Sequence, residues 1–202
     1  AISLTSVVHL TIGALIPQSP QAVGGVLDLR KWPLNKDQVI RLNGEWEFYF
    51  DQLLGPEDFH MAEPSGSLQR VPAAWLDYGD VVPQDTDRFA AATYRLKVLL
   101  PEQNLRYGLK STSIHASARI IVNGQEVLLC GRPGLTREDS ELCYRPETGY
   151  FTASGPELEI IVQTSSQISV ASGITQPIFF GSEAAIKRYR LLQVMLDTPI
   201  SL

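Results

Sequence analysis

The sequence predicts an all-β fold, a sandwich or jelly roll followed by a short C-terminal helix. Apolar and polar residues alternate with period two, as in half-buried strands, in segments separated by Gly, Pro, Asn and Ser. The segments that show this pattern are 26–32, 44–50, 92–100, 106–112, 118–123, 125–130, 158–165 and 175–181. No alternation of strands with long helices interrupts them, which argues against a parallel α/β sheet.

Individual segments support this assignment. "GEWEFYF" (44–50) places Trp46, Phe48 and Phe50 on one face, as expected of a strand with an aromatic inner surface. The stretch 52–59 predicts a short helical turn, broken at Gly55-Pro56.

Asn123-Gly124 lies between two alternating apolar runs and predicts a two-residue hairpin turn. A type I′ turn requires positive φ at both central residues, which Asn and Gly adopt most readily. The alternative is a loop that reads a ligand.

Residues 182–196 predict the C-terminal helix. Ser182 is a suitable N-cap, and Ile186, Leu191, Val194 and Met195 recur at approximately helical spacing. The basic run 187–190 is explained either by proximity to a membrane or by a solvated helix face.

The bulk composition fits one domain of 202 residues with a substantial core. The formal net charge is −5 and no long basic tract occurs, so a nucleic-acid partner is not expected.

The N-terminal segment 1–16 is mostly apolar but shorter than a membrane span. It resembles the hydrophobic part of a signal peptide, with Ala22 as the candidate cleavage edge and Pro20 making that site imperfect. The alternative is a retained segment packed as a strand. We expect export.

Cys130 and Cys143 are the only two cysteines, and they enclose a polar loop rich in Gly and Pro. In an exported protein the expected outcome is a disulfide that restrains this loop. Two free core thiols or a redox pair are the alternatives, and the absence of a Cys-x-x-Cys spacing disfavours the redox pair.

No enzymatic activity, metal site or cofactor is expected. The three histidines have no metal-ligand spacing, and the sequence carries no nucleotide-binding or nucleophile-elbow motif. Acidic residues are plentiful, but solvated loop carboxylates explain them more simply than a pair that hydrolyses glycosidic bonds.

Candidate ligand contacts lie in irregular regions where aromatic rings accompany charged groups, a combination that suits sugars and other small polar ligands. The candidates are Trp75, Asp77, Tyr78, Arg88, Tyr94, His115 and Arg132. For Trp75 and Tyr94, inward packing in the core is an equally good interpretation.

The segments "LNGEWEFYF", "VPAAW", "ATYRLKV", "ARIIVNGQEV" and "LEIIVQTS" resemble, in that order, the sugar-binding jelly-roll domain of family 2 glycoside hydrolases. The resemblance covers roughly 26–181 and implies a galactose-binding-domain-like sandwich. "LDLRKWPLNKDQVIRLNGEWEFYFDQLLGPEDF" and "GITQPIFFGSEAAIKRYR" look more closely like the extracytoplasmic sensor region of bacterial seven-transmembrane receptors with diverse intracellular signalling modules. That resemblance implies a jelly roll that leads directly into the first membrane span.

Three functions follow as expectations. The leading one is a noncatalytic, periplasmic sensor domain for a carbohydrate or other small polar ligand, anchored to the inner membrane through the parent receptor. It would comprise an apolar segment (1–22), the jelly roll (23–181) and a juxtamembrane helix (182–202). The alternatives are an accessory carbohydrate-binding domain of a secreted glycosidase, and a protein-interaction module in which the exposed sheet or the C-terminal helix recognises a partner or a second copy of the chain. Leu191 and Val194 are the helix residues that would test such a homodimer.

Overall fold

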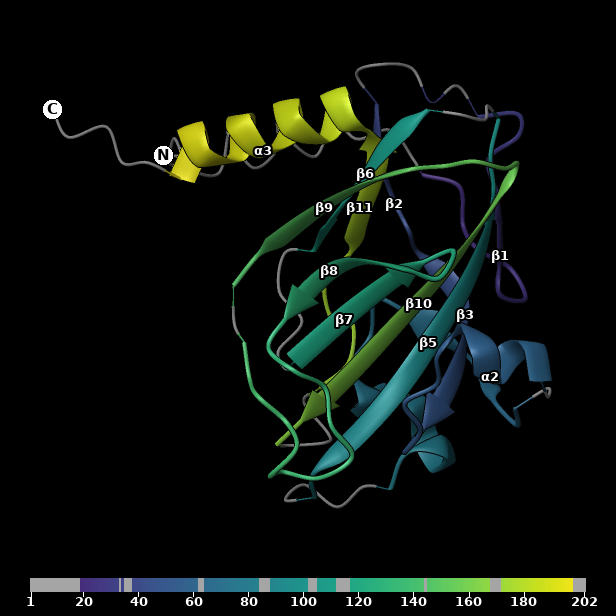
Figure 1. Ribbon diagram of the computed structural model, residues 1–202, viewed down its shortest axis with the longest axis vertical. Helices are drawn as coiled ribbons and strands as arrows, with labels where there is room; N and C mark the ends of the chain where they lie inside the picture. Colours follow the sequence, from purple (N-terminus) through teal and green to yellow (C-terminus); the bar gives the residue numbers. More distant parts are fainter. Residues whose placement is uncertain are drawn as a thin grey trace, which may run out of the picture.

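The computed structural model describes residues 19–32, 34, 38–61, 64–83, 88–101, 105–111, 117–143, 145–167 and 172–197. Within these ranges it has eleven strands in two packed sheets, with helices outside them (Figure 1). The predicted β-sandwich with a C-terminal helix is confirmed.

The larger sheet has seven strands among the described residues. They are β1 (Val26–Asp28), β3 (Gly44–Phe50), β4 (Ser67–Val71), β5 (Ala90–Leu99), β7 (Ser117–Val122), β8 (Gln125–Cys130) and β10 (Glu157–Ser166). Their order is β4-β3-β5-β10-β7-β8, and β1 pairs in parallel with the part of β5 that β3 leaves free. The long antiparallel pair β5–β10 therefore forms the centre of this sheet.

The smaller sheet has four strands in the described part of the chain, in the order β2-β11-β6-β9. They are β2 (Val39–Arg41), β6 (Arg106–Ser111), β9 (Glu147–Thr152) and β11 (Ile178–Ser182). Its inner face contributes Tyr107 and Phe180, whose rings stack at a centroid distance of 5.1 Å. The two inner faces together enclose one hydrophobic core.

The Asn123-Gly124 turn is the predicted hairpin. Both residues have positive φ, 48° and 79°, and they join the paired strands β7 and β8. The Asn123 side chain also bonds to β10: its Oδ1 accepts a hydrogen bond from the Glu159 amide at 2.7 Å, and its Nδ2 donates to the Glu157 carbonyl at 3.3 Å. The turn therefore fixes the hairpin against the neighbouring strand.

Two α-helices and one 3-10 helix lie among the described residues: α2 (Pro56–Met61), η1 (Trp75–Val81) and α3 (Glu183–Asp197). As predicted, Ser182 caps α3, its Oγ accepting a hydrogen bond from the Ala185 amide at 3.2 Å. The first turns of α3 bury Ala185 and Ile186 against the smaller sheet. No helix among the residues described is long and apolar enough to cross a membrane.

The second half of α3 leaves Leu191 and Val194 largely exposed. The homodimer that would cover them stays a prediction.

At the other end of the described chain, Ala22 is buried and pairs with the Gly44 region. The cleavage proposed at Ala22 also stays a prediction.

Candidate functional site

The predicted aromatic candidates lie in the core. Trp75 and Tyr94 are fully buried, and Tyr78 is almost fully buried. Trp75 Nε1 donates a hydrogen bond to the Tyr94 hydroxyl at 2.7 Å, and the Tyr78 hydroxyl donates to the Arg70 carbonyl at 2.9 Å. Phe48 packs against all three rings. These side chains therefore anchor η1 onto the sandwich. The rings pack inward in the core and do not form the exposed ligand-contacting surface that was predicted for this irregular region.

Burial of these hydroxyls changes how the protein should respond to alkali. Burial raises the pKa of Tyr78 from 10.0 to about 12, and burial together with the Tyr78 hydroxyl raises the pKa of Tyr94 well above 10.0. The folded state holds these two protons more tightly than the unfolded chain does. The contribution of the two tyrosines to the free energy of unfolding is therefore fully present below pH 10 and is lost as the pH rises toward 12.

We therefore expect the free energy of unfolding, measured by urea denaturation, to fall between pH 10 and about 12. Tyr78→Phe should make this fall shallower. Phenolate absorbance should show Tyr78 and Tyr94 ionising only as the protein unfolds. Complete ionisation of all tyrosines near pH 10 in a still-folded protein would contradict the assignment.

The polar candidates do not meet in one place. Asp77 is exposed, and its Oδ2 accepts a hydrogen bond from the Ala74 amide at 3.2 Å, which caps η1. Arg88 pairs with Asp51 and lies over the Phe50 ring at 5.7 Å from its centroid. Arg132 donates from Nε to the Asp139 carbonyl at 3.0 Å. His115 lies outside the described residues.

The predicted disulfide is confirmed. Cys130 is joined to Cys143, with their Cα atoms 5.3 Å apart. The enclosed loop is also fastened to β10 through Ser165, whose Oγ lies 2.8 Å from Ser140 Oγ and accepts a hydrogen bond from the Gly134 amide at 3.2 Å. Arg132 thus belongs to a doubly restrained loop.

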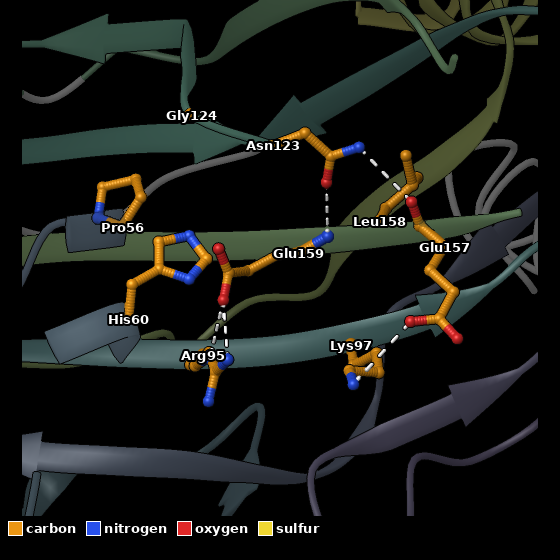
Figure 2. A pocket seen from close by; sticks show the side chains of 9 residues that line it. All are labelled: Pro56, His60, Arg95, Lys97, Asn123, Gly124, Glu157, Leu158 and Glu159. Carbon is orange, nitrogen blue, oxygen red and sulfur yellow. Dashed lines mark hydrogen bonds and ion pairs between the residues drawn. The ribbon is translucent and has the colours of Figure 1, made fainter. Parts of the chain in front are cut away.

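A different region forms the best candidate site. The outer face of the larger sheet, between α2 and the β7–β8 turn, contains a cavity of about 450 Å³ (Figure 2). We call it the outer-face cavity. Its lining residues are Pro56, His60, Arg95, Lys97, Asn123, Gly124, Glu157, Leu158 and Glu159.

Charged side chains at outward positions of β5 and β10 line the cavity. Lys97 and Glu159 are directly paired across the two strands, and Arg95 lies two residues before Lys97 on the same face. Arg95 donates from Nε to Glu159 at 2.8 Å and from Nη1 to Glu47 at 3.2 Å. Burial alone would lower the pKa of Arg95, but the bond to Glu159 and the charges of both carboxylates outweigh it and raise that pKa.

Helix α2 forms one wall because Phe59 holds it to the sheet. The Phe59 ring packs on Tyr49 at a centroid distance of 5.3 Å, and the Arg95 guanidinium carbon lies 4.4 Å from the Phe59 ring centroid. The preceding segment is fixed as well, because the Leu54 amide donates to Thr93 Oγ1 at 2.9 Å. His60, next along the helix, is thereby placed beside Glu159, as Figure 2 shows.

The groups available to a ligand are both donors and acceptors. Lys97 and Glu157 form only a long contact of 3.7 Å, and both side chains are about half exposed. His60 is exposed, and its neutral imidazole ring has one nitrogen that donates a hydrogen bond and one that accepts. Hydroxyl groups, which donate and accept, match such a mixed lining, whereas the described residues contain no cluster suited to a metal ion.

None of the six predicted ligand residues that the structure describes lines this cavity. The sequence did contain a signal: outward Arg95 and Lys97 alternate with buried residues in one strand, and Glu157 and Glu159 do so in another. Recognising the site required knowing that these strands are neighbours and that the Asn123-Gly124 turn closes over them.

Comparison with known proteins shows the fold. No protein-family model matches this chain, and no curated protein matches it significantly. A β-glucuronidase from Ruminococcus gnavus in complex with D-glucuronic acid matches over 71% of this chain at 16% identity, with a TM-score of 0.53. The Faecalibacterium prausnitzii β-glucuronidase matches over 71% at 16% identity, with a TM-score of 0.51. A GH2 β-galacturonidase from Eisenbergiella tayi is 14% identical over 73% of this chain, with a TM-score of 0.47.

The chain spans only 29%, 31% and 25% of those three structures, respectively. The sandwich is therefore of a kind found in part of much longer glycosidases. The fold therefore agrees with the jelly-roll sandwich that the more distant of the two sequence resemblances implies.

Proposed function

We propose that this chain is a noncatalytic, extracytoplasmic binding domain whose outer-face cavity recognises a carbohydrate or a similar polyhydroxylated small molecule. The observation that carries this proposal is the mixed lining of the cavity, with Lys97, His60 and the carboxylates of Glu157 and Glu159 around one space. A mixture of donors and acceptors suits neighbouring hydroxyls, and Arg95 holds Glu159 in position for them. The jelly-roll fold and the disulfide are compatible with such a role outside the cytoplasm.

Substitution of Lys97 tests the site. Lys97→Met removes a half-exposed donor from the cavity, so we expect the dissociation constant for a sugar to rise about tenfold, the typical effect of one charge-assisted hydrogen bond. Isothermal titration calorimetry against a panel of neutral monosaccharides, disaccharides and uronic acids measures it.

Lys31→Met is the matched control, because Lys31 is exposed and lies outside the cavity. It should leave the dissociation constant unchanged. Absence of heat and of any thermal shift at millimolar concentrations across the panel would contradict sugar binding. If both substitutions weakened sugar binding equally, the binding site would have to lie outside the cavity.

We further propose that the domain serves a membrane signalling receptor, with α3 leading to the membrane. The support is the resemblance of 27–59 and 173–190 to receptor sensor regions and the position of α3 immediately after the last strand of the sandwich. A ligand can shift such a receptor only by binding one of its conformations more tightly than the other.

The likeness to parts of β-glucuronidases favours a second candidate, the accessory carbohydrate-binding domain of a secreted glycosidase. The complete parent sequence distinguishes the two. Seven apolar spans would support the receptor, whereas a catalytic domain would support the glycosidase.

A further inference from the structure

A second cavity lies between α3 and the smaller sheet, away from the outer-face cavity. Its volume is about 320 Å³, and we call it the helix wedge. The sheet side is lined by Lys110 of β6 and by Pro146, Glu147 and Thr148 at the start of β9; the helix side is lined by Arg190, Gln193 and Val194. Lys110 and Thr148 are directly paired across the two strands.

The wedge results from the way α3 leaves the sheet. Its first turns are held by Ala185 and Ile186, which pack against Val39 and Phe179. Farther along, the exposed Leu191 and Val194 show that the helix no longer packs closely. Figure 1 shows α3 running outward from β11 and β6, and the cavity is lined on its helix side by residues of the second half of α3.

Two cations from different elements line this space. Lys110 is only 5% exposed, and its Nζ lies 5.9 Å from the ring centroid of Tyr189 on α3. Arg190 lines the same cavity from the helix, and neither the Lys110 nor the Arg190 side chain can accept a hydrogen bond. Glu147 is the only carboxylate among the described lining residues, and Arg145 donates to it at 2.6 Å.

Neutral polar groups complete the lining. Gln193 donates from Nε2 to the Tyr189 hydroxyl at 3.1 Å, which fixes its amide at the helix side. The Thr148 hydroxyl lies at the sheet side beside Lys110. Both can donate to an oxygen anion.

We propose that the helix wedge binds a small soluble phosphate or carboxylate anion between Lys110 and Arg190. A guanidinium and a partly desolvated ammonium together favour such anions, because charge-assisted hydrogen bonds are stronger than neutral ones. The bound anion joins the sheet to the second half of α3 and restrains a helix segment that otherwise packs loosely. This site is independent of sugar binding in the outer-face cavity.

The test is an NMR titration of the intact chain with sodium phosphate and, separately, sodium succinate, at constant ionic strength in chloride. Saturable shifts of the Thr148, Arg190 and Gln193 amides are expected with one or both anions. Hydrogen exchange of the α3 amides from 190 onward should slow when the anion is bound. Arg190→Gln should weaken binding about tenfold, and it should fold because Arg190 is exposed.

Arg188→Gln is the matched control, since it removes the same charge from the same helix outside the wedge. It should change the dissociation constant by less than about twofold, because its effect is screened by solvent and salt. The proposal is overturned if neither anion produces saturable shifts at tens of millimolar, or if both variants weaken binding equally. Binding only to vesicles containing phosphatidylglycerol, and to neither soluble anion, would also overturn it.

Discussion

Trp75→Ala is expected to lower the free energy of unfolding by about 3–5 kcal/mol, the typical effect of truncating a buried aromatic side chain to alanine. Trp75 is fully buried beside Phe48 and Phe50, and its Nε1 bonds to the Tyr94 hydroxyl. The substitution leaves a cavity and removes the indole partner of a buried hydroxyl, so both packing and hydrogen bonding are lost. Urea denaturation monitored by circular dichroism measures the change.

Leu76→Ala provides the control within the same 3-10 helix. Leu76 is 52% exposed, so its truncation should change the free energy of unfolding by less than about 0.5 kcal/mol. Trp75→Phe should keep most of the packing and retain sugar binding. An alanine variant of normal stability that lost sugar binding would instead make Trp75 a ligand contact.

The strands that the sequence predicted are those with a long alternating pattern. The predicted 44–50 and 125–130 agree with β3 and β8 at both ends, and 158–165 lies within β10. Three strands were missed: β2, β4 and β9. The sequence pattern of β2 is too short to recognise, because this strand has three residues. In β4, apolar and polar residues do not alternate regularly along the sequence. Strand β9 contains Gly149, at a position where a Cβ would collide with the Val127 backbone.

Local features were also predictable. The Asn123-Gly124 turn, the Ser182 cap and the Cys130–Cys143 disulfide each depend on residues close in sequence or on a single available pairing. Such features need no knowledge of the tertiary fold.

The candidate site was not predictable in the same way. Sequence reasoning favoured aromatic residues near irregular, charged chain, but η1 turns Trp75 and Tyr78 inward because the core offers their polar atoms partners. The outer-face cavity instead combines side chains from α2, β5, β10 and the β7–β8 turn. The strand order brings residues 97, 123 and 159 together, and the packing of α2 on the sheet adds residue 60.

Replacing both cysteines, as Cys130→Ser with Cys143→Ser, is expected to lower the free energy of unfolding by about 3 kcal/mol. The two residues are 13 apart in sequence, and closing a loop of this length restricts the unfolded chain by that amount in the chain-entropy model. Urea denaturation of the oxidised protein and of the double variant measures the difference, and the reduced native protein should match the variant.

The folded loop should survive this substitution, because other contacts hold it in the native state. The Gly134 amide and the Ser140 hydroxyl both bond to Ser165, and the backbones of Arg132 and Glu141 exchange two hydrogen bonds of 2.8 Å. Sugar affinity should therefore stay unchanged, since the loop does not line the outer-face cavity. If the double variant kept its full stability, restriction of the unfolded chain would not be the role of the disulfide. If it lost sugar binding while folded, the loop would have to contact the ligand, and the binding site would lie at the Arg132 end of the sandwich.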